Sequence, residues 1–173
     1  VKEYKFDDNL ILGNQSPLHF DISASDLYVS LATGSTLVLI PESLFMFPPK
    51  LLDYLEEKGV LDNTVIVYTS DQGFLLGEHG LYDKRFMYEE SFRTPLIISC
   101  PSLVKKHSVC KELVQNIDLA PTFLSLAGVE VPKEMSGRSL LPLFKNGKAE
   151  NWRNELYYHF YDYPAVGSVR KHD

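Results

Sequence analysis

Three features of the 173-residue sequence predict an α/β fold. Residues 37–40, 65–69 and 96–100 are short apolar runs of the kind that forms strands. Segments with apolar residues at helical spacing lie between these runs. Gly and Pro residues separate the segments from one another. This alternation of strands and helices is typical of α/β proteins.

The first expected elements lie within residues 31–58. Residues 31–41 predict the end of a helix, a glycine turn and a buried strand. Residues 44–58 predict a helix that is broken at Pro48-Pro49, because proline cannot continue a helix that precedes it. Residues 51–59 within it have an amphipathic pattern.

A second group of elements is expected between Asp118 and residue 148. A helix should begin after a cap at Asp118, accept Pro121 in its first turn and end at Gly128, which suits a left-handed C-terminal position. Residues 135–146 predict a loop and a short helix, and residues 145–148 an exposed turn. The aromatic-rich residues 156–164 predict a strand in the core or at a sheet edge.

Composition places the chain among ordinary soluble globular sequences. It is 45% hydrophobic and 23% charged, with a formal net charge of −6. This acidity argues against a nucleic-acid partner, and Lys105-Lys106 is too short a basic run to change that conclusion. No apolar run approaches the roughly 18 to 20 residues of a membrane-spanning helix, and no signal peptide is recognisable.

The richest site signal follows the apolar run 65–69, which we expect to be a strand covered on both faces. Ligands of open α/β sheets bind beyond the carboxyl ends of the strands, and Asp71 and Gln72 would lie there. A carboxylate and an amide oxygen suit calcium or magnesium better than zinc. Gly73 would allow a sharp turn beside the ion.

His79 and Lys84 follow in a glycine-flanked loop. The ammonium of Lys84 is a compact charge that suits a sulfate or phosphate oxygen. In the alternative interpretation Asp71 only caps a following helix and Lys84 is a solvated surface lysine. The residues alone leave both interpretations open.

The segment from about residue 51 to residue 173 resembles the C-terminal part of a sulfatase catalytic domain, in the alkaline phosphatase-like superfamily. The resemblance is extended and covers several motifs. They are Leu61–Gly73, Leu76–Gly80, Asp83–Ser91, Arg93–Leu96, Asp118–Thr122, Ala127–Val129 and Gly137–Leu143.

This resemblance implies a partial sulfatase core with a mainly parallel sheet and the hydrolysis of sulfate monoesters, on a carbohydrate or small organic sulfate. Asp71 and Gln72 would be metal ligands, usually to calcium, with magnesium as the alternative ion. Lys84 would bind the sulfate group and act in catalysis. His79 lies in the family's site loop and is the second catalytic candidate.

Sulfatases use a formylglycine nucleophile made from the Cys of a Cys-x-Pro-Ser-Arg motif. The sequence has no such motif, since Cys100-Pro101-Ser102-Leu103 differs in spacing and has no Arg. We therefore expect the chain to be inactive alone and to require an N-terminal sulfatase half as partner. A site with two donors should hold calcium weakly, because Ca²⁺ takes about 6 to 8 oxygen ligands.

Residues 1–58 instead resemble part of an amino-acid adenylation domain, through residues 12–28 and 31–41. There Asp21 would correspond to the carboxylate that pairs with a substrate's α-amino group. Other adenylation motifs are absent, so here Asp21 is better interpreted as a turn or cap residue. The hypothesis is a chimera with residues 1–50 of adenylation type, 51–59 as a shared junction helix and 60–173 of sulfatase type.

Two other functions remain open. A metal-dependent phosphatase or phosphodiesterase of the same superfamily would use a Ser or Thr nucleophile and commonly zinc, whereas Asp71-Gln72 differs from an Asp-His zinc pair. The chain could instead be a chimeric polypeptide without function. The compartment stays open, because sulfatases are often periplasmic, secreted or lysosomal whereas adenylation enzymes are cytoplasmic.

Overall fold

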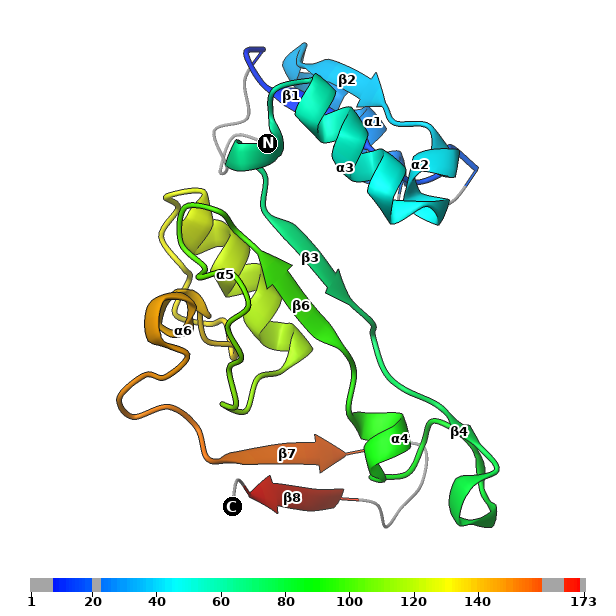
Figure 1. The fold of residues 1–173 in the computed structure, drawn as a ribbon, viewed down its shortest axis with the longest axis vertical. Helices are drawn as coiled ribbons and strands as arrows, with labels where there is room; N and C mark the ends of the chain where they lie inside the picture. Colours follow the sequence, from blue (N-terminus) through cyan, green and yellow to red (C-terminus); the bar gives the residue numbers. More distant parts are fainter. Residues whose placement is uncertain (1–7, 20–22, 160–166, 172–173) are drawn as a thin grey trace. The chain divides into compact units, whose positions relative to one another are not determined.

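The computed structural model describes residues 8–19, 23–159 and 167–171, and for His159 and 167–171 it describes the backbone alone (Figure 1). The chain divides into two compact units, Val1–Asp62 and Asn63–Asp173. Within the described residues no helix is long and apolar enough to cross a membrane.

Unit 1 begins with a βαβ arrangement. Strand β1 (Ile11–Asn14) pairs in parallel with β2 (Thr36–Leu39), and helix α1 (Ser23–Thr33) connects them. Gly34 follows α1 with a φ of +73°, which confirms the expected glycine turn. The strand itself is less covered than expected, since Leu39 is 57% exposed. Asp21 lies outside the described residues.

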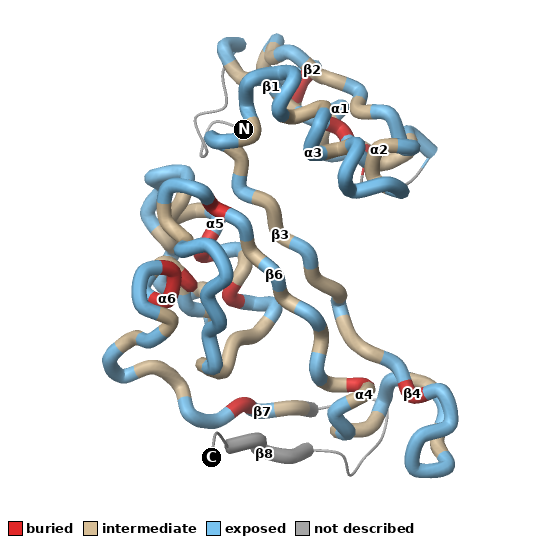
Figure 2. The backbone as a smooth tube through the Cα atoms, viewed as in Figure 1, coloured by how far each residue is buried: buried red, intermediate tan, exposed pale blue. Residues whose placement is uncertain are grey.

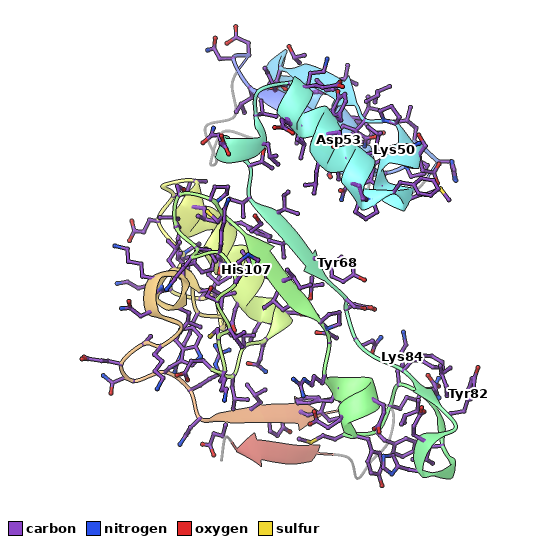
Figure 3. All side chains as sticks on the ribbon, viewed as in Figure 1. Lys50, Asp53, Tyr68, Tyr82, Lys84 and His107 are labelled. Carbon is purple, nitrogen blue, oxygen red and sulfur yellow. The ribbon has the colours of Figure 1, made fainter. Side chains whose placement is uncertain are left out.

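Two helices complete unit 1, α2 (Glu42–Met46) and α3 (Pro48–Glu57), followed at the boundary by the 3-10 turn η1 (Leu61–Asn63). The expected break is confirmed, because Phe47 separates the helices and Pro48 begins the second one. Lys50 and Asp53 lie on the exposed face of α3 (Figure 3). In the described part of unit 1 the buried residues are polar: Asn14, Ser23 and Ser30.

Unit 2 combines short strands with three helices and two 3-10 turns among its described residues. Its strands are β3 (Ile66–Thr69), β4 (Leu75–Leu76), β5 (Tyr82–Asp83), β6 (Leu96–Ser99), β7 (Glu155–His159) and β8 (Gly167–Lys171). Its helices are α4 (Glu89–Phe92), α5 (Leu119–Leu126) and α6 (Leu141–Asn146), with 3-10 turns η2 (Glu78–Gly80) and η3 (Asn116–Asp118).

The expectation of a mainly parallel sheet is wrong for the described strands of unit 2. These strands form three antiparallel pairs, β3–β6, β4–β5 and β7–β8. The expectation that the strand at residues 65–69 is covered on both faces is also wrong, because one face of the β3–β6 pair is exposed. Tyr68 and Ile97 are paired directly across the strands and are 63% and 64% exposed. An apolar run indicates a strand but not the direction of its partner, and it does not show which face is covered.

The core of unit 2 lies between β6 and the helices α5 and α6. Leu140, Leu143 and Phe144 are buried at its centre, and Leu96 and Ile98 of β6 pack against them. Figure 2 shows further buried positions on β4, α4, α5 and β7. The covered face of β6 is therefore fixed by the short helix that the sequence predicts within residues 135–146.

Asp118 is the most densely bonded buried side chain described in unit 2. It is completely buried and forms a two-point ion pair with the Arg153 guanidinium, in which Nη2 lies 2.7 Å from Oδ1. Its two oxygens also accept the backbone N–H groups of Gln115 and Arg138, each at 2.8 Å. The bonds to four N–H donors satisfy the buried carboxylate.

Helix α5 confirms most of its prediction. It begins directly after Asp118, contains Pro121 in its first turn and ends before Gly128, which has a φ of +69°. The Asp118 side chain, however, accepts no capping hydrogen bond from the first turn of α5. The carboxylate instead bonds to Arg153 and to backbone N–H groups in the loops before η3 and α6.

Removal of Arg153 should strongly destabilise unit 2. Arg153→Met leaves a buried carboxylate without its counter-charge, so the free energy of unfolding should fall by about 3 to 5 kcal/mol. Urea unfolding followed through Trp152, the chain's single tryptophan, measures this loss. Arg93→Met is the matched control, because Arg93 is exposed and lies 3.8 Å from Glu89, and it should cost less than about 1 kcal/mol. Equal losses in the two variants would contradict the prediction.

Candidate functional site

The turn Ser70–Gly73 follows β3 and carries the two expected metal ligands. Asp71 Oδ1 accepts the backbone N–H of Gln72 at 2.9 Å, and the Ser70 hydroxyl donates to the Gln72 carbonyl at 2.9 Å. The Gln72 bond holds the pKa of Asp71 below its ordinary value, aided by the Ser70 hydroxyl and the charge of Lys84. Asp71 is thus an exposed, ionised carboxylate at physiological pH.

Gly73 fits a position where no side chain can be placed. Its N–H donates to the Ser91 carbonyl at 2.9 Å, which brings the turn against α4. A Cβ at Gly73 would lie 2.0 Å from the Glu90 carbonyl oxygen. The glycine therefore permits the close approach of two backbones, as expected of a glycine beside a ligand site.

Lys84 follows the β4–β5 hairpin (Figure 3). Its backbone N–H donates to Asp83 Oδ1 at 2.8 Å, and Asp83 has a φ of 93°, so the chain bends sharply before the lysine. The Tyr158 hydroxyl of β7 donates to the carbonyl of the next residue, Arg85, at 2.9 Å. Burial raises the pKa of Tyr158, which keeps this donor protonated.

Asp71, Gln72 and Lys84 line one cavity of about 310 Å³. The cavity therefore brings together three of the four residues that the sequence singled out. Its other lining residues come from α4 and the connection after it, from the loop before η3, from η3 and from β7: Ser91, Phe92, Thr94, Val114, Gln115, Asn116, Ile117, Leu156 and Tyr158.

His79 lies apart from the lining of this cavity. It is at the tip of the β4–β5 hairpin with a φ of 58°, and its ring stacks on Tyr88 with centroids 4.0 Å apart. Its Nε2 is 3.3 Å from Glu90 Oε2. The structure therefore gives His79 an aromatic and a carboxylate neighbour, and does not bring it together with Asp71 and Lys84.

The oxygen donors of the turn suit a hard cation. Asp71 offers a carboxylate and Gln72 an amide oxygen, which are ligands for calcium or magnesium. Within the described residues no group of three or more His, Cys, Asp and Glu side chains gathers as a metal cluster. An ion at this turn would therefore need waters or further ligands to complete its coordination.

Sequence reasoning missed Asn116 and Tyr158 as site residues. Asn116 Nδ2 donates to the carbonyls of Ser70 and Asp71, and Tyr158 supports the backbone beside Lys84. Both lie more than 40 residues beyond the segments that they contact. No local spacing could have revealed them, because the contacts depend on how η3 and β7 pack.

The family described as N-sulphoglucosamine sulphohydrolase, C-terminal, matches residues 77–173, which is more than half of the chain. The chain belongs to this family. The match includes Lys84 and begins just after the turn that carries Asp71. The sulfatase resemblance inferred from the sequence is thereby confirmed at the level of the family.

The relatives of this family member include sulfatases. An N-acetylglucosamine-6-O-sulfatase of Bacteroides thetaiotaomicron is 58% identical over 125 residues, covering 71% of the chain and 22% of the relative. A protein solved with its substrate D-glucosamine-2-N,6-O-disulfate is 52% identical with a TM-score of 0.67, covering 71% of the chain and 26% of that protein.

A phosphonate monoester hydrolase from Silicibacter pomeroyi is 30% identical to the family member, with a TM-score of 0.62. The match covers 78% of the chain and 25% of that protein. The chain thus spans about a quarter or less of the length of these relatives. Their shared fold supports the α/β, alkaline phosphatase-like assignment. The proposed adenylation origin of residues 1–50 finds no support in these comparisons and stays a prediction.

A side chain at position 73 should displace the site turn. In Gly73→Ala the new methyl group would overlap the Glu90 carbonyl, so the turn must move and unfolding should be easier by about 1 to 3 kcal/mol. NMR should show large shifts in the amide signals of Asp71 and Gln72. Gly128→Ala is the control, because space around Gly128 is open and only its positive φ is strained. Unchanged site signals in Gly73→Ala would contradict the close approach.

Proposed function

We propose that this chain forms part of the sulfate-ester site of a sulfatase whose substrate is a sulfated amino sugar. The observation that carries the proposal is the single cavity shared by Asp71, Gln72 and Lys84. The substrate class is supported by the names of the relatives, an N-acetylglucosamine-6-O-sulfatase and a protein solved with a glucosamine disulfate.

Each of the three residues has a distinct part in this proposal. The Lys84 ammonium binds a sulfate oxygen and offsets the charge that develops on the leaving group. Asp71 and Gln72 hold a calcium ion, with magnesium as the alternative. When bound, such an ion polarises the sulfate oxygens as a Lewis acid. The Gln72 backbone N–H, aided by the charge of Lys84, holds the pKa of Asp71 below its ordinary value and so favours the ionised carboxylate.

The formylglycine nucleophile of a sulfatase has no candidate among the residues that line the cavity. None of them is a cysteine, and the sequence contains no Cys-x-Pro-Ser-Arg motif. We propose that the chain alone does not turn over a sulfate ester and that an N-terminal sulfatase segment supplies the nucleophile. His79 has no assigned step, since it lies outside the cavity lining.

A second function, the hydrolysis of a phosphate or phosphonate ester, is favoured by the likeness to the phosphonate monoester hydrolase. Phosphate and sulfate esters are both tetrahedral anions, so Lys84 could bind either. The Asp-Gln pair argues for a calcium-type ion over zinc, which phosphatases of the superfamily commonly use. The two functions can therefore be distinguished by whether the site prefers a sulfate or a phosphate ester, and calcium or zinc.

Loss of the Lys84 charge should weaken binding of a sulfated sugar. In an NMR titration with glucosamine 6-sulfate, the amide signals of Gln72 and Lys84 should shift saturably. Lys84→Ala should weaken this binding by about tenfold or more, because a charge-assisted hydrogen bond is lost. The control is Lys105→Ala, an exposed lysine outside the cavity lining. Equal binding of unsulfated glucosamine, or no effect of Lys84→Ala, would contradict a sulfate site.

Calcium binding should depend on the Asp71 carboxylate. With two protein donors the dissociation constant should be about a millimolar or weaker, and an NMR titration can follow it at Gln72. Asp71→Asn removes the charge with little change in shape and should abolish the saturable response. Glu134→Gln, which removes a charge from an exposed loop, should leave the response intact. Tighter binding of zinc than of calcium would favour the phosphatase function instead.

A further inference from the structure

The Asn116 carboxamide contacts the site turn from a distant part of the sequence. Its Nδ2 group donates to the Ser70 carbonyl at 3.1 Å and to the Asp71 carbonyl at 2.9 Å. An NH₂ group has two N–H donors, so one side chain satisfies two consecutive carbonyls. The two bonds act on the backbone directly beside the proposed metal ligand.

Most other hydrogen bonds of the turn are internal to it. The Ser70 hydroxyl and the Asp71 carboxylate both bond within Ser70–Gln72. These bonds define the shape of the turn, but they do not fix its place in the unit. Among the described hydrogen bonds, that place is set by Asn116 on one side and by the bond from Gly73 to Ser91 on the other.

Asn116 itself stands on a rigid base. It is the first residue of η3, and this turn is closed by reciprocal side-chain bonds between Gln115 and Asp118. Asp118 is in turn held by the buried Arg153. Gly137 packs so closely that a Cβ there would lie 2.0 Å from the Ile117 carbonyl oxygen, which leaves η3 little room to move.

We infer that Asn116 is a positioning residue that fixes the direction of the Asp71 carboxylate toward the cavity. This inference rests on the proposed function for the meaning of that direction. An amide suits the position because both of its partners are carbonyl acceptors. A carboxylate there would face two carbonyl oxygens with no donor, and a short side chain would not reach them. Groups that orient metal ligands typically change metal affinity by 10-fold to 100-fold when they are lost.

The test compares Asn116→Ala with wild-type protein in two measurements. Amide hydrogen exchange of Gln72 and Gly73 should become about tenfold faster, because two hydrogen bonds that restrain the turn are lost. The saturable calcium response at Gln72 should weaken by about tenfold or be lost. Asn146→Ala, an exposed substitution at the end of α6, should change neither measurement.

A merely structural role predicts a different result. In that case Asn116→Ala would accelerate exchange at Ile98 in the core as much as at Gln72, and calcium affinity of the folded protein would not change. That outcome would overturn the inference. If Asn116→Ala fails to fold, Asn116→Asp retains the size of the side chain and should still accelerate exchange at Gln72. A wild-type chain that does not respond to calcium would refute the cation site, and the exchange data would then decide alone whether Asn116 fixes the turn.

Discussion

The buried ion pair between Asp118 and Arg153 is the interaction on which the rest of unit 2 depends. A carboxylate that is fully removed from water is costly unless it is paired and hydrogen-bonded, and here it meets both conditions. Its partners come from three separate segments, those of Gln115, Arg138 and Arg153. The single side chain therefore joins the loop before η3, the loop before α6 and the segment that leads into β7.

The positions of the site residues depend on the segments that this ion pair joins. η3 presents Asn116 to the turn after β3, while β7 presents Tyr158 to the backbone beside Lys84. Asp71 and Lys84 themselves lie on connections that follow β3 and β5. Their positions are accordingly maintained by contacts with residues that are distant in the sequence. Binding sites on loops commonly consist of exposed functional groups that a rigid scaffold holds in position.

The sequence predicted those features that depend on local chemistry. The break before Pro48, the end of α5 before Gly128 and the β3 and β6 strands all follow from the residues at those positions. The sequence also singled out Asp71, Gln72 and Lys84, because their residue types stand directly after a strand or in a glycine-flanked loop, and the structure places them around one cavity. Strand direction, the exposed face of Tyr68 and the contacts of Asn116 were not predictable in this way. They depend on pairing between segments that are distant in the sequence, and a local pattern contains no information about such pairing.

The open face of β3–β6 has a consequence for how the chain behaves in solution. Tyr68 and Ile97 form an apolar cross-strand pair on a two-stranded ladder, and such a ladder is marginal without further cover. Surfaces of this kind attract other strands or sheets, including those of identical molecules. The net charge of −6 opposes such contacts by mutual repulsion. Salt concentration, which screens this repulsion, should thus govern whether the chain stays dispersed or self-associates.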